Sequence, residues 1–255
     1  MIFVYDITTV VSSEASSEAS GYELANAINY ESPWLMWRST STGAQTITLN
    51  YSGSIDSLAL LGTNFENVNI KAGGWFAGDG WFADGWFEGG ESSSETLGYL
   101  RLMNEYRGLI IFTSRDSKIV FEIPAQGTLG GESYFTMSAI IIGNKTIIAR
   151  RPVSPMNKML ALPVSEITLE SQIPKKAALG NKYHTINLNR KGMDISDLNE
   201  FRDIKRAVGK TDAFIFYENM NEKGKVFLVR RIEDFSYHKD DYHDFQDGMA
   251  MEEIA

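Results

Sequence analysis

The sequence contains no cysteine and only three histidines among its 255 residues. The absence of cysteine excludes disulfide bonds, a thiol nucleophile, and zinc or iron–sulfur sites held by thiolates. Basic residues are also scarce, since 24 Lys and Arg stand against 33 Asp and Glu, a formal net charge of −9. Because nucleic-acid binding needs cations to neutralise phosphates, we expect no nucleic-acid partner.

Long hydrophobic runs are missing as well. The longest, such as residues 139–142, fall far short of the roughly 20 residues that a membrane-spanning helix needs. The first residues lack the basic start and long apolar stretch of a signal peptide. Hydrophobic residues nevertheless make up 43% of the chain, which is ordinary for a globular protein. We therefore expect a soluble, unprocessed protein with no membrane span and one large or two modest domains.

The charge is unevenly distributed along the chain. Residues 1–142 contain 6 Lys/Arg and 16 Asp/Glu, whereas residues 143–255 contain 18 and 17. Two prolines follow this change at residues 152 and 155, and proline disfavours regular helices and ladders. The change predicts two domains, residues 1–145 and 146–255. A surface loop within one domain is the alternative.

The first half has the alternation typical of β-strands. In residues 46–51 the apolar side chains of Ile47, Leu49 and Tyr51 fall on one face, as expected for a half-buried strand. Further strands are predicted at residues 57–61, 68–70, 97–103, 109–113, 118–123 and 134–142. This series of short strands predicts a mainly β fold, a jelly-roll or similar β-sandwich. A short helix is predicted at residues 22–28, and the serine-rich residues 12–20 are expected to form an exposed loop or arm.

The second half predicts a smaller β-rich domain with one helix. Leu198, Phe201, Ile204 and Val208 recur at helical spacing, which predicts an amphipathic helix near residues 196–208. Residues 213–217 and 226–232 are predicted to form a hairpin. Additional strands are predicted at residues 166–169, 183–189 and 249–253.

A Gly-Trp-Phe unit occurs three times within the glycine-rich residues 72–90. Its rings are the candidate binding or interface residues: Trp75, Phe76, Trp81, Phe82, Trp86 and Phe87. Three interpretations stay open. The loop packs on one end of the sandwich, it contacts a neighbouring subunit through anchoring aromatic residues, or it stacks on a sugar.

Recognised catalytic motifs are absent from the sequence: there is no nucleophile elbow, P-loop, dinucleotide-binding fingerprint or H-E-x-x-H pattern. The densest group of potential metal ligands is His238, Asp240, Asp241, His243 and Asp244. Its spacing matches no known ligand pattern, so a solvated loop is the better interpretation. We therefore expect no catalytic residues, no metal, no cofactor and no enzymatic activity.

Two short segments resemble a known family. Trp37-Arg38-Ser39 ends one loop, and Leu60-Leu61-Gly62-Thr63-Asn64 lies in a later strand. Together with their surroundings they resemble a discoidin-like, galactose-binding-type jelly roll over residues 20–145, with Thr63 where histidine is common. We expect Trp34 and Trp37 to be core or end-cap rings, and Arg38 to pair with a carboxylate or backbone carbonyls.

The combination of this jelly roll with a second β domain resembles structural proteins of tailed-phage virions, especially tail and tail-tip proteins. The resemblance implies a non-enzymatic protein of the virion tail that assembles into a homo-oligomeric ring with other virion proteins. The alternative is a carbohydrate-binding module for host-surface glycans, although no sugar-site residues match. The Gly-Trp-Phe insertion does not belong to the family pattern.

Overall fold

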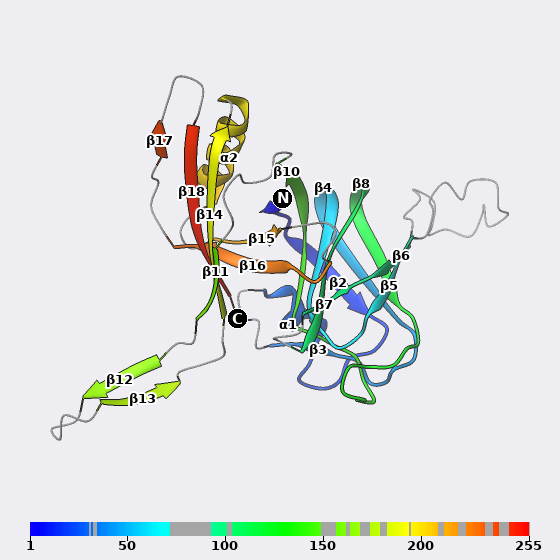
Figure 1. Cartoon of the computed structure of the whole chain (residues 1–255). Helices are drawn as coiled ribbons and strands as arrows, with labels where there is room; N and C mark the ends of the chain where they lie inside the picture. Colours follow the sequence, from blue (N-terminus) through cyan, green and yellow to red (C-terminus); the bar gives the residue numbers. More distant parts are fainter. Residues whose placement is uncertain are drawn as a thin grey trace. The chain divides into compact units, whose positions relative to one another are not determined.

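The computed structural model of the chain describes residues 1–30, 32, 35–71, 93–100, 104–148, 157–161, 164–168, 174–178, 183–193, 195–208, 212–218, 223–232, 237–239 and 245–254. Strands dominate these residues, which contain two helices, α1 (Leu24–Ile28) and α2 (Ile195–Ala207) (Figure 1). The chain divides into two compact units. We call Ile2–Thr146 with Tyr217–Val226 the sandwich unit, and Ile147–Phe216 with Phe227–Ala255 the C-terminal unit.

Two long strands, β4 (Gln45–Thr63) and β8 (Glu105–Ile123), organise the sandwich unit. They pair with each other over most of their length, and hydrogen bonds through them join the strands of this unit into one continuous sheet that folds into the two layers of the sandwich. The first half of β4 also pairs with β2 (Val10–Ala15), and the second half with β10 (Ala139–Ile147). The predicted strands at residues 46–51 and 57–61 are thus two halves of one strand. The strands predicted at residues 109–113 and 118–123 are likewise joined in β8.

The change of direction within β4 occurs at a register shift between Asn50 and Ser54. Gly53 has a φ of +88° there, a conformation that is energetically unfavourable for any residue with a Cβ. Alternation of buried and exposed residues stops at this point, which explains why the sequence predicts a strand end there. The bulge bends the strand from one sheet into the other.

Shorter strands complete the sandwich unit. One sheet adds β5 (Asn67–Lys71) beside β8, followed by β6 (Ser93–Thr96). The other sheet has β1 (Ile2–Ile7) beside β10, and β7 (Gly98–Leu100) beside β8. β3 (Trp37–Arg38) and β9 (Thr136–Met137) form a small separate pair. Residues 2–7 carry no alternation to predict a strand, because Ile2, Phe3 and Val4 are consecutive apolar residues and all buried.

The core lies between the two sheets. Ile47 and Leu49 from the first half of β4 belong to the same buried cluster as Leu58 and Leu60 from its second half. Aromatic rings fill the cluster further: Trp37, Phe65, Phe121 and Phe135 are completely buried. Burying large apolar side chains in this way is the main stabilising contribution to such a fold. The predicted class, a mainly β protein with a sandwich and a smaller β-rich part, is confirmed.

The serine-rich residues 12–20 do not form the expected arm. Residues up to Ala15 belong to β2, whose backbone pairs with β4 from Tyr51 to Ile47. Beyond the strand, Ser16 Oγ and Ser17 Oγ donate to Gln45 Oε1 at 2.8 and 2.6 Å. The prediction was wrong for residues 12–15, because backbone pairing holds them in a strand. Residues 16–20 form a loop, in which the hydroxyls of Ser16 and Ser17 bond to Gln45.

The C-terminal unit has the strand order β11 (Asn157–Ala161), β14 (Tyr183–Met193), β18 (Phe245–Glu253), β16 (Val226–Arg231) and β15 (Ala213–Tyr217). β12 (Val164–Thr168) pairs with β13 (Pro174–Ala178), and β17 (Tyr237–Lys239) pairs with β18. α2 buries Phe201 and Ile204, and Val208 is buried just after its end; these are three of the apolar positions from which the helix is predicted. No helix in the described ranges is long and apolar enough to cross a membrane.

Candidate ligand-binding site

Backbone pairing at one corner of the sandwich unit holds two distant segments together. β3 pairs antiparallel with β9, so that Trp37 lies opposite Met137 and Arg38 opposite Thr136. Ser39 continues the pairing, because its N–H donates to Phe135 O at 3.0 Å and its Oγ accepts from Phe135 N at 2.8 Å. Tyr134, immediately before Phe135, is thereby held beside Arg38.

A third segment is attached to the same strand. Ala19 N donates to Arg38 O at 2.8 Å, and Arg38 N donates to Tyr22 O at 3.1 Å. Trp37, which is fully buried, donates its Nε1–H to Ser17 O at 3.2 Å. These bonds place Tyr22 on the other flank of the arginine.

The Arg38 side chain contacts the faces of both tyrosines. Its Cζ lies 4.5 Å from the ring centroid of Tyr22 and 4.5 Å from that of Tyr134, which is cation–π distance. No carboxylate within the described residues pairs with the guanidinium, and its Nε is buried without a hydrogen-bond partner. The expected pairing with a carboxylate or carbonyls is therefore replaced, among the described residues, by two aromatic contacts. We call Tyr22, Arg38 and Tyr134 the tyrosine–arginine clamp.

Asn64, the last residue of the Leu60–Asn64 segment, holds the backbone on either side of Phe135 through its side-chain amide. Its Nδ2 donates to Tyr134 O at 2.9 Å, and its Oδ1 accepts from Thr136 N at 2.8 Å. Gly62, with a φ of +62°, leaves room for Ser138, because a Cβ there would lie 2.4 Å from Ser138 Oγ. The residues that carry the family resemblance therefore position Tyr134 through backbone hydrogen bonds.

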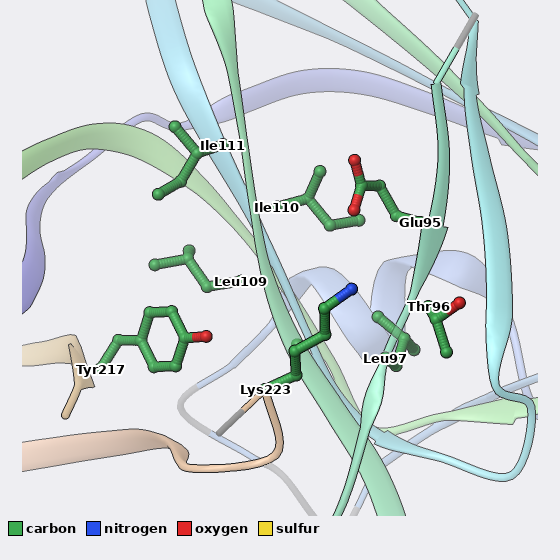
Figure 2. A pocket seen from close by; sticks show the side chains of 9 residues that line it. Glu95, Thr96, Leu97, Leu109, Ile110, Ile111, Tyr217 and Lys223 are labelled. Atoms are coloured by element: carbon green, nitrogen blue, oxygen red, sulfur yellow. The ribbon is translucent and has the colours of Figure 1, made fainter. Parts of the chain in front are cut away.

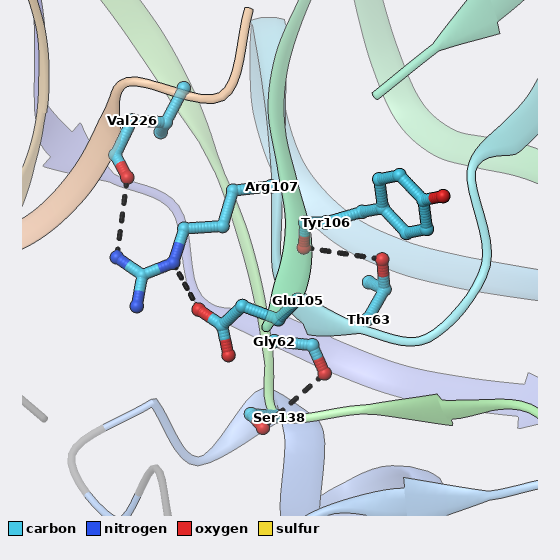
Figure 3. Close-up of polar contacts among 7 residues, drawn as sticks. All are labelled: Gly62, Thr63, Glu105, Tyr106, Arg107, Ser138 and Val226. Atoms are coloured by element: carbon cyan, nitrogen blue, oxygen red, sulfur yellow. Dashed lines mark hydrogen bonds and ion pairs between the residues drawn. The ribbon is translucent and has the colours of Figure 1, made fainter. Parts of the chain in front are cut away.

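A second arginine of the sandwich unit is placed very differently. Arg107 is nearly buried, and its Nε forms an ion pair with Glu105 Oε1. Its Nη1 donates to Val226 O at 3.4 Å (Figure 3). In the same part of the unit the backbone at Gly98 lies against the backbone at Gly224, because a Cβ on Gly98 would lie 1.7 Å from Gly224 N. Arg107 thus bonds to a segment that returns to the sandwich late in the sequence.

Two pockets of about 200 Å³ lie in the sandwich unit. The first has an apolar lining from Leu97 and residues 109–111, with Glu95 and Lys223 as its charged residues (Figure 2). The second is lined mainly by residues 7–10, 28–30 and 140–142 and has no charged residue. Neither pocket contains a group of catalytic or metal-ligating side chains.

Burial raises the pKa of three tyrosines. That of Tyr51 rises to about 12, because burial outweighs the nearby Arg115 guanidinium, and Asp116 adds to the increase. Burial also raises the pKa of Tyr106, helped by Glu66 and Tyr99, and that of Tyr217. Tyr51 donates its hydroxyl to Arg115 O at 3.1 Å, which indicates a structural role.

The six rings proposed from sequence, in residues 72–90, lie outside the described residues. In the potential metal cluster, His238 lies on β17 opposite Gln246, while residues 240–244 are also outside. No group of three or more potential metal ligands occurs in the part of the chain that the structure describes. Sequence reasoning singled out Arg38 but missed Tyr22 and Tyr134, because nothing in the sequence links positions so far apart.

No family model matches the sequence, and no curated protein matches it. Among solved structures, it is similar to chitosan-binding module 1 of a chitosanase/glucanase from Paenibacillus sp. IK-5 (16% identity, TM-score 0.37, 54% of this chain and 98% of that one). It is also similar to the lectin domain of lectinolysin complexed with Lewis B antigen (9%, 0.36, 52% and 92%). A third is XRCC1 bound to the catalytic domain of DNA polymerase β (13%, 0.38, 56% and 98%). Scores this low assign neither family nor function.

Proposed function

We propose that the protein is a carbohydrate-binding protein whose ligand occupies the tyrosine–arginine clamp. The observation that supports this most directly is the Arg38 guanidinium, which two tyrosine rings flank and no described carboxylate neutralises. Sugars present apolar C–H faces that pack on aromatic rings, and oxygens that accept hydrogen bonds from a guanidinium. The clamp supplies both kinds of group at one place.

The clamp also has the rigidity that a binding site needs. Backbone hydrogen bonds from residues 38 and 39 hold the Tyr22 and Tyr134 segments, and Asn64 adds two more. Preorganised groups bind with less loss of conformational entropy than mobile ones. Tyr22 is 36% exposed, so part of its ring is open to a ligand.

A glycan array followed by calorimetric titration of the best ligand tests this function. We expect Tyr22→Ala to weaken binding at least tenfold. The matched control is Tyr99→Ala, since Tyr99 is an exposed tyrosine of the same unit that packs on Tyr106. An array without any signal above background would refute carbohydrate binding, and equal losses in the two variants would place the ligand elsewhere.

The Gly-Trp-Phe loop is the competing location for a sugar. Trp81→Ala distinguishes the two, because a ligand held by the loop loses affinity in this variant and keeps it in Tyr22→Ala. A ligand held by the clamp gives the opposite result.

We keep assembly in a phage tail as a second proposal. It is supported by the sequence resemblance of residues 20–145 and by the presence of a second β-rich unit. Analytical ultracentrifugation at high concentration and mass spectrometry of purified virions test it. A protein that stays monomeric and is absent from virions is not a ring component of the tail. In both proposals the protein acts by binding and carries out no catalysis.

A further inference from the structure

We infer that the sugar bound at the clamp carries a carboxylate, as a uronic or sialic acid residue does. This inference rests on the proposed function and adds the chemical class of the ligand. It follows from which donors of Arg38 are open, which nearby carboxylates are already engaged, and what geometry a guanidinium recognises.

The open donors of Arg38 are its two terminal nitrogens. Nε is enclosed and has no partner, whereas Nη1 and Nη2 are not fully enclosed and form no hydrogen bond with a described residue. The arginine therefore offers a parallel pair of N–H donors at its outer end. This pair matches the two oxygens of a carboxylate, which accept them in a bidentate arrangement.

Two carboxylates close to Tyr22 in the sequence already bind backbone groups. Glu18 Oε1 accepts from Leu24 N at 2.9 Å, and Glu23 Oε1 accepts from Gly21 N at 3.1 Å. Both contacts hold the loop that begins α1. A half-buried cation without a counter-ion is unfavourable, so a ligand carboxylate improves the electrostatics of this corner.

The shape of the site favours a carboxylate over a sulfate or phosphate. A guanidinium is planar, and a carboxylate can lie in the same plane with both oxygens bonded. A tetrahedral anion can also accept two bonds from the fork, but its remaining oxygens lie out of the guanidinium plane, and both tyrosine ring centroids are within 4.5 Å of Cζ. The net charge of the surrounding chain repels an anionic ligand, because residues 1–142 contain 16 acidic and only 6 basic residues. Attraction of the ligand carboxylate to Arg38 has to overcome this repulsion. Short acidic sugars should therefore bind better than long polyanions at low ionic strength.

Calorimetric titration with matched sugars tests the inference. One set is sialyllactose, lactose and sulfated lactose, and the other is trigalacturonate and its methyl ester, in which the carboxylates are neutralised. We expect the better of the two acids to bind at least about tenfold more tightly than its neutral counterpart, as is usual for a hydrogen bond to a charged group. Arg38→Lys keeps the charge but removes the fork, so the preference should fall to less than threefold.

Arg115→Met is the control variant, because Arg115 also lies over an aromatic ring, that of Phe112 at 5.3 Å, but already donates to Lys71 O. It should bind the acidic sugars as the unmodified protein does. Equal affinity for acid and neutral sugars overturns the inference and leaves carbohydrate binding intact. A preference for sulfated lactose, or an unchanged preference in Arg38→Lys, also overturns it. If no sugar binds in the titrations or on the array, both proposals fail.

Discussion

Arg107 is buried and Arg38 is half-buried in the same unit, and their surroundings differ in kind. Arg107 has a carboxylate from Glu105 and a carbonyl from Val226. Arg38 has two ring faces and, among the described residues, neither a carboxylate nor a carbonyl for its side chain. A buried charge is normally paired, so Arg107 follows the rule and Arg38 departs from it.

This difference separates a group that holds the fold together from a group that is available to a ligand. Removing one partner of a buried ion pair leaves the other charge without compensation, which strongly destabilises the folded protein. Removing a guanidinium that has no paired partner leaves nothing uncompensated behind. Stability and binding measurements on the two arginines should therefore give opposite results.

The largest effect is expected for Arg107→Met, which should lower the free energy of unfolding by about 2–3 kcal/mol. Glu105 then loses its partner while its side chain stays only 21% exposed, and Val226 O loses a donor. Urea denaturation followed by circular dichroism measures the change. Lys118→Met, at an exposed position on the same strand, controls for the loss of one positive charge. A change below about 0.5 kcal/mol would remove the contrast with Arg38.

Asn64→Ala should lower the free energy of unfolding by about 2 kcal/mol, because the backbone groups of Tyr134 and Thr136 lose their partners. It should also weaken sugar binding, since Tyr134 is no longer held beside Arg38. Asn64→Asp keeps the acceptor for Thr136 N but replaces the donor to Tyr134 O by a carboxylate oxygen, so it should weaken sugar binding as Asn64→Ala does. If binding survives Asn64→Ala unchanged, Tyr134 does not need this support.

Alkaline pH should destabilise the fold through Tyr51. Its pKa is raised from 10.0 to about 12 in the folded protein, so the folded protein keeps a proton that the unfolded chain releases. Stability is therefore complete below pH 10 and decreases as the pH approaches 12. Urea midpoints measured across this range should fall, and the slope should be shallower in Tyr51→Phe. Part of the slope remains in that variant, because the pKa values of Tyr106 and Tyr217 are raised as well. A slope that Tyr51→Phe leaves unchanged would exclude Tyr51 as its source.

The smallest change in stability is expected for Arg38→Met, less than about 1 kcal/mol in either direction. Two cation–π contacts are lost, but methionine keeps contact with the rings and removes the unpartnered Nε. Urea denaturation measures the change. A loss as large as that of Arg107→Met would show that Arg38, too, is mainly structural.

Much of the fold was accessible from the sequence where side chains alternate. Ile47, Leu49 and Tyr51 predict their strand because they face the core on one side only. The prediction failed where the backbone decides: at Gly53 a bulge interrupts the pattern of one continuous strand, and in residues 12–15 a polar strand is held by pairing with β4. Neither feature leaves a hydrophobic pattern to detect.

The candidate site was accessible only in part. Trp37 and Arg38 carry the family resemblance, and the burial of Trp37 is as expected. The partners of Arg38 depend on the pairing of β3 with β9, which brings Tyr134 next to it from almost a hundred residues away. Long-range pairing between such short strands has no sequence signal of its own. The roles predicted for Trp75, Trp81 and Trp86 stay predictions, and so does assembly in a phage tail.

The bond from Arg107 to Val226 also bears on how the protein is made. The sandwich unit includes residues from Tyr217 to Val226, and Gly224 of this stretch lies against Gly98. Domains generally fold as units during synthesis, the N-terminal one first. Here the N-terminal sheets emerge from the ribosome long before the segment that completes them. The sandwich unit therefore cannot be completed until translation has passed residue 226, and until then Arg107 lacks the carbonyl of Val226 as a partner.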